Sequence, residues 1–122
     1  MAQNVLHFNG RDSKVDIPFS AQLNPKSFTV EIWAKAIGGS GTWRSPLTSR
    51  DDGPARGFIL YAGENNDWQF WIGMGEGWVT ISGPQIEPDK WTHLAGTYDE
   101  SSKNMLFYVN GSGSASIMLP WL

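Results

Sequence analysis

Hydrophobic and polar side chains alternate along much of this chain. The clearest example is residues 28–35, FTVEIWAK, in which Phe28, Val30, Ile32 and Ala34 form one set and the intervening side chains form the other. A period of two places the two sets on opposite faces of a β-strand. We therefore predict a strand over 28–35 with the first set in the core. No stretch of useful length shows the 3.6-residue period of a helix.

Two further alternating runs predict a β-hairpin near the end of the chain. Residues 91–99 read WTHLAGTYD and residues 106–111 read LFYVNG, with the polar segment 99–104 between them. This arrangement is typical of two antiparallel strands joined by a turn. Shorter apolar runs predict strands at 5–8, 15–17, 45–49, 58–61, 68–72 and 78–82, and 38–57 is the longest break in the pattern. The sequence therefore predicts an all-β protein.

These runs resemble the laminin G-like (concanavalin A-like) lectin-glucanase family. The most specific piece is WTHLAGTYD at 91–99 followed by FYVNG at 107–111. Three upstream pieces come in the order the family expects: LHFNG with VDIP at 6–18, FTVEIWAK at 28–35, and GFILY with WQFWIG at 57–73. The resemblance covers about residues 4–111 and implies an antiparallel β-sandwich of the jelly-roll type, with 1–122 as a single domain.

The pattern departs from the family after Gly111. Further strands normally follow in the family, including a closing strand beside the N-terminal strand, and residues 112–122 do not resemble them. We therefore expect a C-terminally truncated domain with 112–122 as an atypical tail. The expected consequence is an unpaired strand edge near Leu6 and Val15 with exposed apolar surface. Such an edge favours self-association.

Composition limits the classes of partner. A chain of 122 residues fits one domain, and its formal net charge of -3 gives no basic patch for nucleic acid and no attraction to an anionic membrane. The absence of cysteine excludes disulfides, a thiol nucleophile and a zinc–thiolate site. No apolar run reaches membrane-spanning length, and no signal-peptide pattern opens the sequence. The family implies an extracellular or cell-surface location, whereas the sequence shows no signal peptide. The sequence therefore does not decide the compartment.

Enzyme activity is not expected from the candidate chemistry. Glycoside hydrolases need two carboxylates that flank the scissile bond. The strand at 28–35 carries only Glu31, with Thr29 and Trp33 as neighbours on its face. We expect Glu31 to face solvent and His7 and His93 to have structural roles.

Calcium is a candidate cofactor, because the resemblance implies a Ca²⁺ site at the rim of the sandwich. Calcium prefers carboxylate, amide and carbonyl oxygens. The candidate ligands in turns and loops are Asp12, Asp99 and Asn110. Asp99 has an equally good alternative role, which is to stabilise its own turn by hydrogen bonds to the backbone.

Carbohydrate binding is the leading functional hypothesis. Aromatic rings stack on sugar rings, and polar side chains bond the hydroxyls. Candidates in or beside the glycine-rich loops are Trp43, Arg44, Arg50, Asp51, Asn65, Trp71 and Trp78. Trp68 and Trp71 have opposite parity, so both cannot point into the core of a regular strand. We expect a noncatalytic carbohydrate-binding or adhesion module whose partner is a glycan or glycoprotein. The alternative is a structural or protein-interaction domain that oligomerises and has no sugar site.

Overall fold

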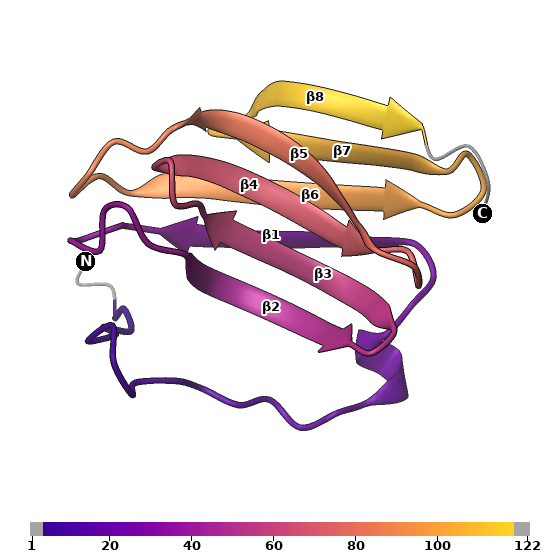
Figure 1. Ribbon diagram of the computed structural model, residues 1–122, viewed down its shortest axis with the longest axis horizontal. Coiled ribbons are helices and arrows are strands. Elements are labelled where there is room, and N and C mark those ends of the chain that lie inside the picture. Colours follow the sequence, from indigo (N-terminus) through magenta and orange to yellow (C-terminus); the bar gives the residue numbers. More distant parts are fainter. Residues whose placement is uncertain (1–3, 119–122) are drawn as a thin grey trace.

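A computed structural model of the chain describes residues 4–118, which form two antiparallel sheets packed face to face (Figure 1). The first sheet has the order β1 (Phe28–Ala34), β6 (Thr92–Asp99), β7 (Asn104–Val109) and β8 (Ser112–Met118). The second has the order β2 (Arg44–Asp52), β3 (Ala55–Ala62), β4 (Asp67–Gly73) and β5 (Trp78–Gln85). A single 3-10 turn, η1 (Ala21–Leu23), precedes β1. The predicted class, an all-β antiparallel sandwich, is confirmed.

The core lies between the sheets and follows the alternation of the sequence. The largest fully buried side chains of this core are Leu60, Phe70, Ile81, Leu94, Met105 and Phe107. In β1 the side chains of Phe28, Val30 and Ile32 pack against this cluster, as the sequence predicts. Burial of each large apolar side chain contributes about 1.5–3 kcal/mol to folding.

Gly96 in β6 permits close approach of the two sheets. A Cβ atom at this position would lie 2.6 Å from ring atoms of Phe70 in β4. The Phe70 ring in turn packs on Phe107, with ring centroids 6.0 Å apart. The glycine in the WTHLAGTYD run therefore makes room for an aromatic side chain of the opposite sheet.

The predicted strands at 5–8 and 15–17 are wrong. The structure has no strand between residue 4 and β1, and apolar side chains such as Leu6 and Val15 are exposed. Only the turn between them forms, because Asn9 Oδ1 accepts the backbone N–H groups of residues 11–13 and Gly10 takes a positive φ. An alternating run becomes a strand only where a sheet edge accepts it, since an isolated hairpin is marginal in water. The strand edge expected near Leu6 and Val15 is therefore absent, and the first sheet ends in β1 and β8 instead.

Two boundaries also differ from the expectation. Residues 50–52, predicted inside a long break, extend β2, which pairs with β3 from Asp52 opposite Ala55 to Arg44 opposite Ala62. In the predicted atypical tail, residues 112–118 form β8, antiparallel to β7 with Val109 opposite Ser112. The last four residues of that tail lie outside the described residues. The tail therefore contributes a strand to the first sheet.

Candidate functional site

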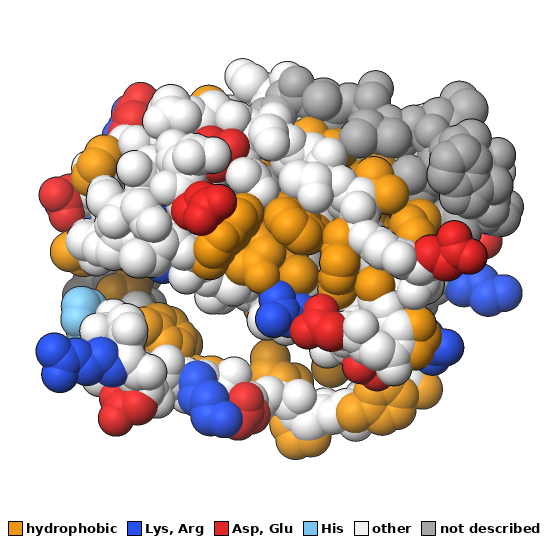
Figure 2. Space-filling view, in the orientation of Figure 1, with side chains coloured by type: hydrophobic (Ala, Val, Ile, Leu, Met, Phe, Trp, Pro, Cys, Tyr) orange, Lys and Arg blue, Asp and Glu red, His pale blue; other side chains and the backbone are white. Residues whose placement is uncertain are grey.

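Four aromatic side chains form a continuous surface on the outer face of the second sheet. Tyr61 lies on β3, Trp71 on β4 and Trp78 on β5, and Trp43 directly precedes β2. The ring centroids are 4.9 Å apart for Trp43 and Tyr61, 5.3 Å for Tyr61 and Trp71, and 6.3 Å for Trp71 and Trp78. Figure 2 shows hydrophobic side chains gathered in the middle of this face. We call these four residues the aromatic surface.

Strand parity explains why these rings face outward. On β4 the side chains of Trp68 and Phe70 belong to the buried core, and Trp71 has the opposite parity. The prediction that Trp68 and Trp71 point to opposite faces is therefore confirmed, because Trp68 is buried while Trp71 is half-buried. Tyr61 directly follows the core residue Leu60 on β3, so its side chain also points to the outer face.

A chain of hydrogen bonds fixes the orientation of Trp71. Its indole Nε1 donates to Gln69 Oε1 at 2.8 Å, and Gln69 Nε2 donates to Asp67 Oδ1 at 2.9 Å. Gln69 is buried, and both ends of its side-chain amide are hydrogen-bonded, Oε1 to Trp71 and Nε2 to Asp67. The N–H of Trp71 is used within the protein, and the ring itself is what the residue offers to a ligand.

Arg50 lies beside the aromatic surface and is paired on two sides. Its Nη1 donates to the Tyr61 hydroxyl at 2.6 Å, and its Nε lies 3.5 Å from Asp52 Oδ2. Arg50 and Asp52 are two positions apart on β2 and share its outer side. The result is an aromatic surface with a hydrogen-bond donor and an acceptor next to it.

Stacking and hydrogen bonding to hydroxyl groups are the interactions that this arrangement can provide. Trp43 is 45% exposed, and the other three rings are half-buried. Rings that meet edge to face, such as Trp43 and Trp71 at 85°, are held in a fixed geometry. A rigid aromatic surface costs little conformational entropy when a ligand binds to it.

The structure brings together four of the seven predicted ligand-binding residues: Trp43, Arg50, Trp71 and Trp78. Tyr61, Gln69 and Asp52 complete this group and were missed. The signal was available in strand parity, because Tyr61 and Gln69 alternate with core residues in the same runs.

The other three predicted residues have different surroundings. The Arg44 guanidinium donates to Gly38 O, Thr42 O and Asn66 Oδ1, so it holds the loop before β2 against the β3–β4 turn. Burial lowers the pKa of Arg44 from its ordinary value. Asp51 Oδ1 accepts the N–H of Gly53 in the β2–β3 turn, and Asn65 is exposed in the β3–β4 turn.

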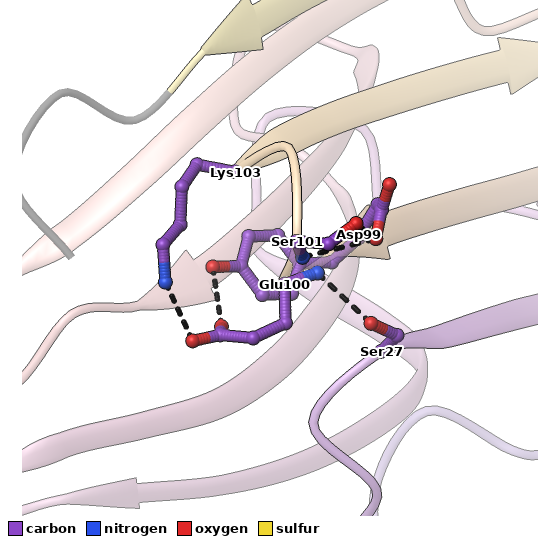
Figure 3. A network of polar contacts seen from close by, with 6 residues as sticks. Ser27, Asp99, Glu100, Ser101 and Lys103 are labelled. Atoms are coloured by element: carbon purple, nitrogen blue, oxygen red, sulfur yellow. Dashed lines mark hydrogen bonds and ion pairs between the residues drawn. The ribbon is translucent and has the colours of Figure 1, made fainter.

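The carboxylate of Asp99, a predicted calcium ligand, is engaged in its own turn (Figure 3). Its Oδ1 accepts the N–H and hydroxyl of Ser101, and its Oδ2 accepts the hydroxyl of Ser102 at 2.8 Å. These bonds, that from the Ser102 hydroxyl first, lower the pKa of Asp99. The geometry matches the alternative role of Asp99 as a turn stabiliser.

The three predicted calcium ligands do not lie together. Asp99 is opposite Asn104 at one end of the β6–β7 pair, whereas Asn110 follows Val109 at the other end. Asn110 Oδ1 accepts the N–H of His93, and Asp12 Oδ1 accepts the side-chain amide of Asn9. Within residues 4–118 no group of three His, Cys, Asp or Glu side chains is placed to hold a metal ion. Calcium binding stays a prediction without a common ligand set.

The outer face of the first sheet carries the lone carboxylate that the sequence singled out. Glu31 Oε1 lies 3.3 Å from His93 Nε2, and the ring of Trp33 lies 5.0 Å from that of His93. Glu31 and Trp33 are exposed, as expected for the solvent side of β1. The contact pairs the carboxylate with an imidazole rather than with a second acid.

Comparison with known proteins gives a family match over most of the chain. Residues 9–120 match the model of the concanavalin A-like lectin/glucanases superfamily. Among curated proteins, pappalysin-1 of Mus musculus is 28% identical over 125 residues, and pappalysin-1 of Homo sapiens is 28% identical over 128 residues. Each match covers 91% of this chain and 8% of the relative, so the chain spans a small part of these proteins.

Solved structures support the fold. The Ruminococcus gnavus IT-sialidase CBM40 bound to alpha2,3 sialyllactose has a TM-score of 0.65 and 19% identity, covering 76% of this chain and 53% of that chain. The same module bound to alpha2,6 sialyllactose has a TM-score of 0.65 and 18% identity, covering 78% and 56%. At these identities the likeness shows the fold alone. Within residues 4–118 no helix has the length and apolar character needed to cross a bilayer.

Proposed function

The chain belongs to the concanavalin A-like lectin/glucanases superfamily, and from this premise we propose that it is a noncatalytic carbohydrate-binding module. The observation that carries the proposal is the aromatic surface on the second sheet, where Tyr61 and Trp71 meet with centroids 5.3 Å apart. Aromatic rings that are half-exposed and held rigidly suit the apolar faces of sugar rings. The CBM40 structures with bound sialyllactose support a saccharide as ligand of this fold.

The polar groups at the surface suit hydroxyl recognition. Arg50 supplies N–H donors, and Asp52 supplies carboxylate acceptors. A sugar hydroxyl both donates and accepts, so the two side chains complement it. In the proposed complex, the rings supply contact area and the Arg50–Asp52 pair fixes the orientation of the saccharide.

The arrangement of acids supports a noncatalytic role. Asp52 is paired with Arg50, and Asp67 accepts a hydrogen bond from Gln69. On the first sheet Glu31 is paired with His93. A glycosidase needs two carboxyl groups set to act on one bond, and these acids are each engaged by a different partner. Incubation with β-glucans should therefore release no reducing sugar.

The proposal is tested by replacing one ring of the aromatic surface. Trp71→Ala should weaken binding to a glycan array about tenfold or more, because loss of about 1.4 kcal/mol of ring contact changes the dissociation constant tenfold. The melting temperature should fall, because the buried Gln69 loses the N–H donor of Trp71, but the variant should remain folded at the temperature of the assay. The matched control is Trp33→Ala, which removes an exposed tryptophan from the other sheet and should leave binding unchanged.

Two results would count against this assignment. Unaltered binding by Trp71→Ala would place the ligand elsewhere, and unfolding of the variant would show that this ring serves the stability of the fold. Running the array with Ca²⁺ and with a chelator also tests the predicted calcium dependence. Binding that is lost on chelation would support a metal at the rim of the sandwich.

A structural or protein-interaction domain is the second candidate function. The exposed apolar side chains before β1, including Phe19 at 83% exposed, favour it. The two candidates separate on the array, because an interaction domain without a sugar site binds no glycan. An extracellular adhesion role belongs to the first candidate and requires glycan binding.

A further inference from the structure

The charges around the aromatic surface are balanced or negative. The guanidinium of Arg50 is compensated by Asp52, with 3.5 Å between Nε and Oδ2. Asp67, which accepts a hydrogen bond from Gln69, adds a second carboxylate on the same side of the second sheet. Figure 2 shows basic and acidic side chains next to each other at the edge of the hydrophobic patch.

Arg44, a second guanidinium of the second sheet, is directed to the protein itself. It donates to two backbone carbonyls, at Gly38 and Thr42, and to the side-chain oxygen of Asn66. These three acceptors hold it against the loop before β2 and the β3–β4 turn. Arg44 therefore does not supply an uncompensated cation to the aromatic surface.

This balance discriminates between classes of sugar. A carboxylate on a sugar only accepts hydrogen bonds, so it needs donors and a local positive charge. At this surface it would approach Asp52 together with Arg50, and the attraction of one would be offset by the repulsion of the other. A hydroxyl group accepts from Arg50 and donates to Asp52, so it uses both members of the pair.

We propose that the aromatic surface selects neutral saccharides over those that carry a carboxylate, such as sialylated or uronic-acid glycans. This inference rests on the proposed function and specifies its ligand class. Asp52 is the specificity-determining residue, because its carboxylate compensates Arg50 and repels an acidic sugar.

The test uses pairs of immobilised glycans that differ only in a terminal sialic acid. The neutral member of each pair should bind about fivefold more tightly, since the carboxylates of Asp52 and Asp67 outweigh Arg50 by one charge, and a like charge about 4 Å away costs roughly 1 kcal/mol in a medium as polar as water. Treatment of the sialylated member with a sialidase should restore binding. Affinity for the neutral member should change little between low and high salt, because no net charge is neutralised.

A variant of Asp52 locates the origin of the preference. Asp52→Asn removes the repelling charge while keeping an acceptor, so the neutral-to-sialylated ratio should fall to about one. The control Glu31→Gln removes the same charge from the outer face of the first sheet and should leave the ratio unchanged. An unchanged ratio in Asp52→Asn would show that Asp52 does not set the preference.

The outcomes separate this inference from the function on which it rests. Equal or tighter binding of sialylated glycans overturns the neutral preference and leaves carbohydrate binding intact. Absence of binding to every glycan, neutral or acidic, overturns the proposed function. If the protein prefers the neutral glycans and Trp71→Ala abolishes this binding, the result supports both the proposed function and the neutral preference.

Discussion

Gly96 is a single residue whose lack of a side chain sets the distance between the sheets. Gly96→Ala would place a Cβ atom 2.6 Å from the buried ring of Phe70, so one of the two strands must shift. We expect a loss of about 1–3 kcal/mol of unfolding free energy, as for overpacking of other cores. Urea denaturation followed by tryptophan fluorescence measures it. Gly77→Ala is the control, since a Cβ there meets no atom within 4 Å, and an equal loss in both variants would contradict the argument.

Residue identity in the candidate site was partly predictable for a physical reason. Parity fixes the face of each side chain in a strand, so Trp71 could be assigned to the outside once Trp68 was assigned to the core. The same rule, applied to Leu60 and Tyr61, predicts that Tyr61 also faces outward. The Arg50–Asp52 pair required knowledge that β2 continues to Asp52, and the sequence there has the glycine, proline and acids of a loop. Arg44 could not be assigned, because one of its partners, Asn66, lies 22 positions away in the β3–β4 turn.

The turn between β6 and β7 is an element whose stability should depend on pH. Hydrogen bonds from Lys103 and then from Tyr98 lower the pKa of Glu100, and burial raises the pKa of Tyr98 to about 12 (Figure 3). A lowered carboxyl pKa in the folded protein stabilises it above the unfolded pKa of about 4.3, and this contribution is lost as the pH falls through the folded pKa. Glu100→Gln should therefore lower the melting temperature at pH 7, with the difference from the parent shrinking toward pH 3.

A second ion pair of the same spacing provides the control for that experiment. Glu87 and Lys90 also lie three positions apart, but both side chains are more than half exposed and no tyrosine hydroxyl joins them. Exposed pairs contribute little, so Glu87→Gln should leave the melting temperature nearly unchanged across the pH range. A pH-independent difference for Glu100→Gln would show that its effect comes from packing rather than from ionisation.

Strands with partners were predictable, and those without partners were not. The run 28–35 and the predicted hairpin of 91–99 and 106–111 alternate, and both pair over most of their length in the first sheet. The runs at 5–8 and 15–17 alternate as well, yet no described strand pairs with them. Alternation indicates which side chains would lie on each face of a strand. Whether the strand forms also depends on a partner strand elsewhere in the chain. The converse holds for β8, which the sequence did not predict: its small polar residues depart from alternation, but its backbone pairs with β7.

The edges of the whole sandwich differ in how they are protected. The second sheet ends in β2 and β5, which contain Pro46 and Pro84, and proline lacks the N–H that a new strand would need. The first sheet has β1 at one edge, and β1 contains no proline. Seven large apolar residues before β1 are exposed: Val5, Leu6, Phe8, Val15, Ile17, Phe19 and Leu23. An unprotected edge joined to an exposed apolar segment is where a second copy of the chain would associate.

We expect this segment to drive self-association in solution. Light scattering coupled to size-exclusion chromatography should give a mass that rises with protein concentration, and sulfate should strengthen the association because it favours burial of apolar surface. The double variant Ile17→Lys, Phe19→Lys should shift the protein toward monomer, since charged side chains on an apolar contact oppose its desolvation. Lys14→Ala, which removes the partner of Asp16 in the same segment, should leave the mass unchanged. A monomer at every concentration would show that these side chains, exposed at 69% for Ile17 and 83% for Phe19, do not recruit a second copy.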